Sequence, residues 1–227
     1  MEIVNPGNED YHMHSINYSD GLNTIDEIVK FAGEIGLKKI AITDHNQAYL
    51  DARTFPRKSY RGIIKRWQNV FNNVIVEFGV EADILNSKGD VCMDIQGEIP
   101  ELIILSTHQS PPYQEDSKTI TEGYLNAIER FHDKINFLGH PCSVYHGENV
   151  DIIAVTELCN KYEIPLEVNG ANLATNRTNL NKLKQMLSIA DQIYVNSDAH
   201  TLNELKTVRR KAFQYLRENG YIKGKYL

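Results

Sequence analysis

Short apolar runs alternate with amphipathic helical patterns along the whole of this 227-residue chain. The apolar runs are rich in β-branched residues and bounded by turn residues, which is typical of strands buried on both faces of a sheet. Six such runs lie at residues 39–43, 74–80, 102–106, 135–138, 165–168 and 192–195, and a shorter first strand ends at residues 11–13. Because strand and helix alternate about seven times, the pattern predicts a mostly parallel sheet, either open or closed into a barrel.

Three of the intervening helices begin with a capping box, in which a threonine and a glutamate three residues later satisfy free backbone N–H groups. The three pairs are Thr24 with Glu27, Thr119 with Glu122, and Thr201 with Glu204. Gly36 and Gly220 stand where the first and last of these helices are expected to end. Further helices are predicted at residues 60–71, 151–162 and 180–190. These helices supply the crossover connections that parallel strands require.

Composition limits the class of protein. Hydrophobic residues make up 41% and charged residues 24% of the chain, which argues against intrinsic disorder. The formal net charge of −6 disfavours a polybasic membrane binder or a nucleic-acid coat. No apolar run approaches the roughly 18 residues needed to span a bilayer, and the first residues lack the features of a signal peptide. The length suits one domain over residues 1–227. Cys92, Cys142 and Cys159 form no C-x-x-C pair, so we expect reduced thiols in a cytoplasmic protein.

Histidines and carboxylates gather at the ends of the predicted strands. Six of the eight histidines follow a strand, namely His12, His14, His45, His108, His140 and His200. Carboxylates stand beside them at Asp20, Asp44, Glu81, Glu167 and Asp198. Residues two apart in an extended segment point the same way, so His12 and His14 project together, as do Asp198 and His200. A barrel holds its chemistry at the carboxyl ends of its strands, and imidazole and carboxylate bind zinc, manganese or iron, so the pattern predicts a metal site at that rim.

Taken in order, these elements resemble the polymerase and histidinol phosphatase (PHP) family. The matching motifs are His12-x-His14, Asp20-Gly21, Thr43-Asp44-His45, Gly79-Val80-Glu81, His108, Gly139-His140-Pro141 and Ser197-Asp198-Ala199-His200. The resemblance implies an α/β fold, a distorted seven-stranded (β/α) barrel with its metal site at the carboxyl ends of the strands. It also implies two or three divalent metal ions, which would be zinc, manganese or iron.

The resemblance further assigns the metal ligands to three positions. His12, His14, Glu81 and Asp198 would hold the first metal, while Glu81 would bridge to a second that His108 and His140 complete. Asp20, His45 and His200 would hold a third. Asp44 is interpreted as a partner that fixes the tautomer of the His45 ring. Glu167 and Asn169 are expected to shape the rim of the site without binding metal.

The activity that the resemblance implies is hydrolysis of a phosphate ester by a metal-bridging hydroxide, with Glu81 and Asp198 as catalytic carboxylates. The expected substrate is a small anionic phosphomonoester, either histidinol phosphate or a nucleotide or sugar-like phosphate. Arg177 is predicted to bind phosphate, the alternative being an ordinary surface arginine. His146 could protonate the leaving group, the alternative being a surface residue or one that supports the site.

Two other functions stay open at this point. A nuclease-like or DNA-proofreading phosphodiesterase would bind nucleic acid, which the acidic net charge disfavours. A non-catalytic, metal-binding regulatory domain is disfavoured by the intact set of ligands. The stretch 53–66 has six basic residues and no acidic one, so it is either a solvated helix face or a gate that attracts an anionic substrate. The sequence leaves the oligomeric state open.

Overall fold

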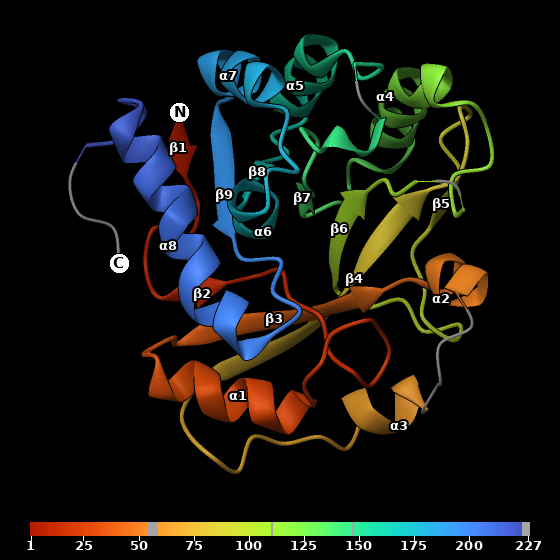
Figure 1. Cartoon of the computed structure of the whole chain (residues 1–227). Coiled ribbons are helices and arrows are strands. Elements are labelled where there is room, and N and C mark those ends of the chain that lie inside the picture. The colour runs from red at the N-terminus through yellow and green to blue at the C-terminus, as the bar shows by residue number, and fades with distance from the viewer. Residues whose placement is uncertain (54–58, 110, 147, 224–227) are drawn as a thin grey trace.

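A curved sheet of mostly parallel strands forms the centre of the structure, a computed structural model that describes residues 1–53, 59–109, 111–146 and 148–223 (Figure 1). The strands are β1 (Glu2–Ile3), β2 (Glu9–Asp10), β3 (Lys39–His45), β4 (Ile75–Ile84), β5 (Val91–Cys92), β6 (Leu102–Ser106), β7 (Phe137–Leu138), β8 (Leu166–Asn169) and β9 (Gln192–Asn196). Their order in the sheet is β1-β9-β8-β7-β6-β4-β3-β2. The short β5 pairs antiparallel with β4, outside this path.

The N-terminal segment joins the two edges of the sheet. Its first part, β1, pairs with β9, and its second part, β2, pairs with β3. Beyond β2, Met13 forms a parallel bridge with Ala199, which follows β9. The parallel path from β2 to β9 contains seven strands within the described residues, so the prediction of a distorted seven-stranded barrel is confirmed. The sequence analysis missed β1 and β5, which have only two residues each.

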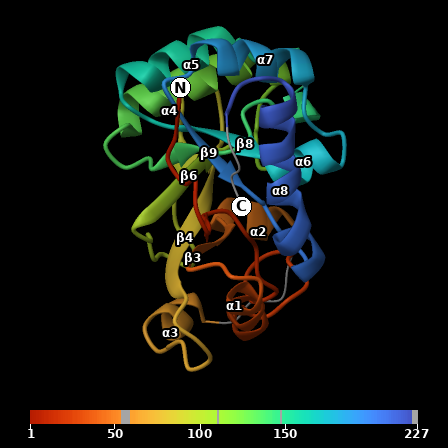
Figure 2. The ribbon, with the colours of Figure 1, turned by 90° about the vertical axis from the view of Figure 1, so that its left-hand side faces the viewer.

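Helices cover the outside of the barrel. They are α1 (Ile25–Glu34), α2 (Gln47–Arg53), α3 (Tyr60–Ile64), α4 (Ile120–Phe131), α5 (Ile152–Lys161), α6 (Gly170–Ala174), α7 (Leu180–Ile189) and α8 (Leu202–Glu218), with short 3-10 turns η1 (Ser117–Thr119) and η2 (Val144–His146). Figures 1 and 2 show α4, α5 and α7 side by side along one side of the sheet and α1 on the opposite side. Within the described residues, no helix is both long enough and apolar enough to cross a membrane.

Apolar side chains between the helices and the sheet form the core. In the largest cluster, Leu105 and Leu138 of the sheet pack with Ile128, Val155 and Phe213 of the covering helices, all of them fully buried. A second cluster lies between α1 and the first strands. Burial of one such side chain stabilises the fold by about 1.5–3 kcal/mol, so these contacts hold the helices in place and thereby fix the strand ends.

Two of the three predicted capping boxes are confirmed, at Thr24 and at Thr201. The box predicted at Thr119 is wrong, because η1 already supplies the turn that precedes α4. The Thr119 hydroxyl instead lies 2.8 Å from both the Tyr113 Oη and the Asp116 carbonyl oxygen. Gly36 and Gly220 have φ angles of 87° and 79°, which confirms that these helices end on residues in the left-handed region.

The helix predicted at residues 60–71 ends much earlier, at Ile64. Beyond it, asparagine side chains replace helical hydrogen bonds. The Asn69 Oδ1 accepts from Phe71 N at 3.0 Å, and Asn72 Nδ2 donates to the Val29 carbonyl at 2.9 Å. Short polar side chains that bind nearby backbone compete with a helix in this way.

Candidate metal centre

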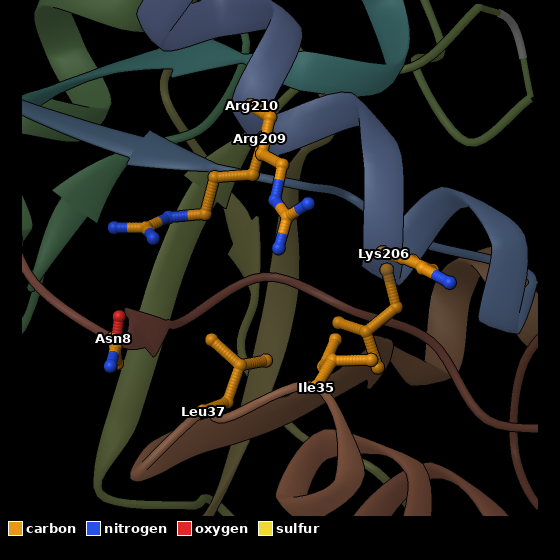
Figure 3. Close-up of a pocket in the computed structure, with 7 residues that line it drawn as sticks. Asn8, Ile35, Leu37, Lys206, Arg209 and Arg210 are labelled. Atoms are coloured by element: carbon orange, nitrogen blue, oxygen red, sulfur yellow. The ribbon is translucent and has the colours of Figure 1, made fainter. Parts of the chain in front are cut away.

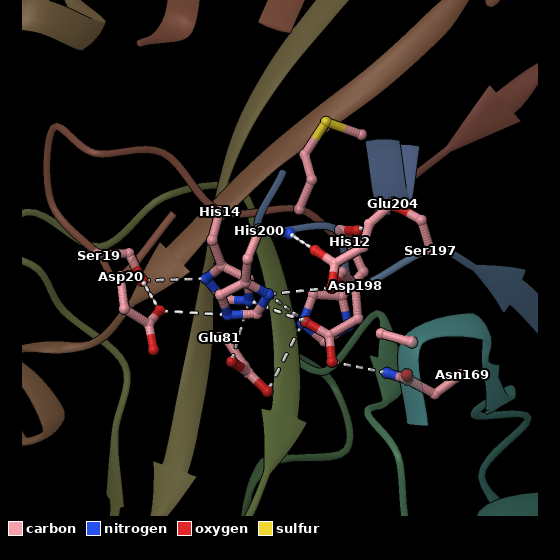
Figure 4. Close-up of polar contacts among 12 residues, drawn as sticks. His12, His14, Ser19, Asp20, Glu81, Asn169, Ser197, Asp198, His200 and Glu204 are labelled. Carbon is pink, nitrogen blue, oxygen red and sulfur yellow. Dashed lines mark hydrogen bonds and ion pairs between the residues drawn. The ribbon is translucent and has the colours of Figure 1, made fainter. Parts of the chain in front are cut away.

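The polar side chains predicted at the strand ends converge at one end of the barrel (Figure 4). Glu81 of β4 lies at the centre of the group, with 1% of its side chain exposed. Its two oxygens face five histidine rings. Oε1 lies 2.6 Å from His140 Nε2, 3.5 Å from His108 Nε2 and 3.6 Å from His12 Nε2, while Oε2 lies 2.9 Å from His45 Nδ1 and 3.5 Å from His14 Nε2.

Two further carboxylates complete the group, one on each side of the histidines. Asp198 Oδ1 lies 3.2 Å from His14 Nε2 and 3.5 Å from His12 Nε2. Asp20 Oδ1 lies 3.3 Å from His45 Nε2 and 3.2 Å from His200 Nε2. The predicted common orientation of His12 and His14 is confirmed, because both rings present Nε2 to Glu81 and Asp198.

The donor atoms are close enough together to share metal ions. Among the residues that the structure describes, three sets have ligand atoms within 4.8 Å of one another, namely His12, His14 and Glu81; His45, Glu81 and His108; and His14, Asp20, His45 and His200. Nε2 of His12 and of His14 and Oε2 of Glu81 are buried and make no hydrogen bond within the described part of the chain. These atoms meet one another and Asp198 in close contacts between imidazole and carboxylate, and nitrogen and oxygen donors of this kind suit zinc, manganese or iron. The residues therefore fit a cluster of divalent cations.

Two buried carboxylates hold the histidine rings in position. His12 Nδ1 donates to Glu167 Oε1 at 2.8 Å, and His108 Nδ1 donates to Asp83 Oδ1 at 2.7 Å. A ring that donates through Nδ1 keeps its Nε2 lone pair free for a metal. Glu167 also accepts from the His140 backbone N–H at 2.9 Å, so it does more than shape the rim. The sequence analysis missed Asp83, although it stands two residues after Glu81 in β4 and therefore points to the same face.

The interpretation of Asp44 as a partner of His45 is wrong. Its carboxylate accepts from the Ser15 backbone N–H and from the Ser15 hydroxyl, both at 2.6 Å. Consecutive residues of a strand point to opposite faces, so Asp44 cannot reach the ring of the next residue. Asp44 anchors the loop that follows His14 instead, and burial raises the pKa of its carboxyl to about 7.

Charges in the group shift its pKa values in opposite directions. Burial lowers the pKa of the His45 ring, but the charge of Glu81 and the hydrogen bond with Asp20 outweigh it and raise that pKa to about 10. Burial lowers the pKa of the His200 ring too, but the hydrogen bond with Asp20 and the charge of Asp198 outweigh it and raise that pKa to about 9. Burial raises the pKa of Glu81, but the charges of His108, His12 and His45 lower it well below the usual value. The carboxylates therefore favour the protonated, positively charged rings of His45 and His200 in the metal-free protein.

Backbone conformation at the strand ends is unusual. His140 and Asp198 have φ angles of 29° and 54°, in a region that costs a non-glycine residue about 1–3 kcal/mol. At Gly139, a Cβ atom would lie 2.3 Å from Ser106 Oγ, and at Gly21 it would lie 2.1 Å from the His14 carbonyl oxygen. These glycines allow the close approach of neighbouring segments that turns the histidines toward Glu81.

A cavity of about 280 Å³ opens above the carboxylates and histidines. Its size is near the lower end of the range of about 300–1,000 Å³ that small-molecule sites have. Arg177 lies in its wall, is exposed, and places Nη1 3.5 Å from Tyr145 Oη. Tyr145 and Tyr49 also line it, and the sequence analysis had not placed either residue at the site.

His146 is not among the residues that line this cavity. It is buried, and its Nε2 makes no hydrogen bond to any residue that the structure describes. Burial and the charges of His108 and His140 lower its pKa to about 4, so the ring is neutral at neutral pH. Its role as a proton donor stays a prediction.

The basic stretch 53–66 has two kinds of environment. Arg61 and Lys65 lie 3.4 Å and 3.8 Å from Glu98 Oε1 in exposed ion pairs, as expected of a solvated helix face. Arg53 instead lies over the ring of Tyr49, 3.6 Å from its centroid, and Tyr49 stacks on His45. Arg57 and Lys58 lie outside the described residues.

A second cavity lies between α8 and the residues that follow α1 (Figure 3). Arg209 in its wall is buried and donates to the carbonyl oxygens of Val195 at 2.7 Å, Gly7 at 2.9 Å and Asn5 at 2.5 Å. Arg209 thus ties the N-terminal segment to β9 and supports the barrel away from the metal centre.

Comparisons with known proteins agree with this arrangement. A family model described as PHP domain matches residues 10–215. A probable phosphatase, YcdX, of Escherichia fergusonii is 25% identical over 198 residues, which cover 85% of this chain and 78% of the relative. A probable phosphatase of Shewanella piezotolerans is 27% identical over 199 residues, covering 84% and 77%. Among solved structures, a histidinol phosphate phosphatase of Lactococcus lactis, complexed with zinc, L-histidinol and phosphate, has a similar fold, with a TM-score of 0.58, 18% identity and coverage of 90% and 93%.

Proposed function

This chain belongs to the PHP domain family and is a phosphatase, and from that premise we propose that it hydrolyses a small anionic phosphomonoester with bound divalent metal ions. One observation carries the proposal. The two oxygens of the buried Glu81 face five histidine rings at the floor of a cavity of small-molecule size. We further propose that residues 1–227 form one domain.

The proposed metal ligands are those that the resemblance assigned. His12, His14, Glu81 and Asp198 would hold one ion, Glu81, His108 and His140 a second, and Asp20, His45 and His200 a third. The distances from Asp198 to His12, from Asp20 to His45 and from Glu81 to His140 support this division, although His45 Nδ1 also lies 2.9 Å from Glu81 Oε2. We propose zinc, manganese or iron at these positions, because all ligands are nitrogen or carboxylate oxygen.

Bound divalent cations neutralise phosphoryl oxygens and lower the pKa of water, which is the chemistry that ester hydrolysis needs. The chain itself supplies orientation and charge. Arg177 reaches the cavity from its wall, and a guanidinium can bind two phosphoryl oxygens at once. Asp198 lines the floor with Oδ1 toward the histidines and accepts from Asn169 Nδ2 through Oδ2 at 3.0 Å, so its carboxylate is held in position to bind a cation.

The test is phosphate release by the purified protein, supplied with manganese or zinc, over a panel of phosphomonoesters that includes histidinol phosphate and nucleoside monophosphates. We expect release from at least one ester, and its loss in Asp198→Ala together with metal content. Release that persists in a variant without metal would contradict the proposed ligand role. No release from any ester by the metal-loaded protein would overturn the proposed activity.

A further inference from the structure

The cavity above the metal centre presents more available hydrogen-bond donors than acceptors to a ligand, and this difference limits which leaving group the substrate can carry. Four acidic residues line the cavity within the described chain, namely Asp20, Glu81, Asp198 and Glu204. The carboxylates of Asp20, Glu81 and Asp198 face histidine nitrogens of the metal centre. Under the proposed function these three negative charges also face two or three divalent cations, so they leave no excess negative charge for a ligand.

One oxygen of the fourth carboxylate, Glu204, accepts hydrogen bonds from the N-terminus of α8. Glu204 Oε2 accepts from the backbone N–H groups of His200 at 2.8 Å and Thr201 at 3.0 Å, and from the Thr201 hydroxyl at 3.2 Å. Glu204 also stands in the first turn of α8, where the helix dipole stabilises a negative charge. A ligand cation would therefore meet only Oε1 of this carboxylate, whose negative charge the three donors on Oε2 and the helix dipole already stabilise.

Other residues in the wall of the cavity offer donors. Arg177 carries a guanidinium with five N–H groups, and Tyr145 accepts from it at 3.5 Å, which leaves the Tyr145 hydroxyl proton free. Asn172 is 5% exposed, and its Nδ2 makes no hydrogen bond to any described residue. Thr175 donates its hydroxyl proton to the Ala171 carbonyl at 2.8 Å, and its neutral oxygen does not balance a cation.

We infer that the leaving group of the substrate is an alcohol without an ammonium group, either uncharged or anionic, whose oxygens accept hydrogen bonds from Tyr145 and from the N–H groups of Arg177 that the phosphoryl group does not use. An ammonium presents three donors and no acceptor, so it would face further donors and a guanidinium of the same charge. Burial of such a charge without a partner is costly. Esters of amino alcohols, histidinol phosphate included, are therefore poor substrates.

Three esters of one size test this inference, which rests on the proposed function. They are the phosphates of ethanolamine, ethylene glycol and glycolate, whose leaving groups are cationic, neutral and anionic. With zinc- or manganese-loaded protein we expect kcat/KM for the ethanolamine ester to be lower than for the other two by about tenfold or more, the ratio that about 1.4 kcal/mol gives. Equal or better use of the ethanolamine ester would overturn the inference.

Substituted variants and binding measurements distinguish failure of this inference from failure of the proposed function. Arg177→Gln should reduce the preference for the glycolate over the ethanolamine ester, whereas the exposed Arg217→Gln on the last turn of α8 should not. A preference for the ethanolamine ester that disappears in Glu204→Gln would show that Glu204 binds a cation, and would overturn the inference. If no ester is hydrolysed, the proposed function fails. Calorimetric binding of the same three esters to the loaded protein then decides the inference, which fails if the ethanolamine ester binds best.

Discussion

Glu77 and Glu81 stand four residues apart in β4 and point to the same face of the strand, but at opposite ends of the barrel. Glu77 lies at the amino end, is 41% exposed in its side chain, and forms an ion pair with Lys39 at 2.9 Å. Glu81 lies at the carboxyl end and has 1% of its side chain exposed. It faces histidine rings, and some of their nitrogens make no hydrogen bond to any described residue. The same side chain on the same strand thus has two very different environments.

The residues around Glu77 and around Glu81 differ in the same way as the two glutamates do. At the amino end, Tyr194 packs against Tyr11 and Phe137 with ring centroids 5.4 Å and 4.6 Å away. Such contacts stabilise the barrel. At the carboxyl end, His140 and Asp198 have a strained backbone. Buried ring nitrogens of His12 and His14 there make no hydrogen bond to any described residue, so they are available to bind a cation. The difference teaches that one end of the barrel is built for stability and the other for binding, at a cost in stability.

The largest effect should come from removing the charge of Glu81. Glu81→Gln should lower kcat/KM by about 10³-fold or more, because several kcal/mol of charge stabilisation depend on the bound cations. Metal content by elemental analysis should fall in parallel. Glu77→Gln is the matched control, and its exposed ion pair should change unfolding free energy by less than about 1 kcal/mol and metal content not at all. A Glu81→Gln variant with full metal content and activity would remove the contrast between the two ends.

The two carboxylates behind the rings should have smaller effects. Glu167→Gln and Asp83→Asn each keep the shape of the side chain but weaken the hydrogen bond that orients His12 or His108. Metal affinity should fall by about 10–100-fold, as it does when such supporting groups are changed. Competition with a fluorescent zinc chelator measures this. Glu122→Gln, on the exposed face of α4, is the control, and equal affinities in all variants would show that Glu167 and Asp83 only pack.

Metal removal should make the carboxyl end sensitive to high pH. Burial lowers the pKa of His45 and of His200, but nearby carboxylates more than reverse this and raise the two values to about 10 and about 9 in the folded, metal-free protein. A raised pKa means that the folded state binds the proton more tightly than the unfolded state, where the pKa is about 6.5. The resulting stabilisation is complete below pH of about 6.5 and is lost as the pH rises toward 9 and 10.

Thermal unfolding with and without chelator measures this pH dependence. The Tm of chelator-treated protein should fall between pH 7 and pH 10, and the Tm of zinc-loaded protein should fall less, because the metal ions and not protons balance the carboxylates there. Two parallel curves would mean that the histidines of the carboxyl end do not gain protons on folding.

Several parts of this site could be predicted because they depend on local geometry alone. The period of two in an extended segment places His12 beside His14 wherever the strand lies. The same rule would have found Asp83, but the apolar run at 74–80 suggested that β4 ended before it, whereas the strand continues to Ile84. Adjacency in the sequence assigns Asp44 to His45, but consecutive residues of a strand point to opposite faces, so Asp44 binds Ser15 instead. Tyr145 could not be found, since it lies in the short 3-10 turn η2, where it contacts distant residues such as Arg177.

The smallest effect concerns two capping boxes that differ only in what the glutamate contacts. Thr24→Ala and Thr201→Ala each remove a cap that contributes about 1 kcal/mol, so both should lower Tm by about 2–4 °C. Glu27 accepts from Thr24 and from the Asn23 side chain, whereas Glu204 accepts from Thr201 and from the His200 backbone N–H at 2.8 Å. Thr201→Ala should therefore weaken metal binding near His200 as well, while Thr24→Ala should leave it unchanged. Equal zinc affinity in the two variants would mean that Glu204 holds His200 without help from Thr201.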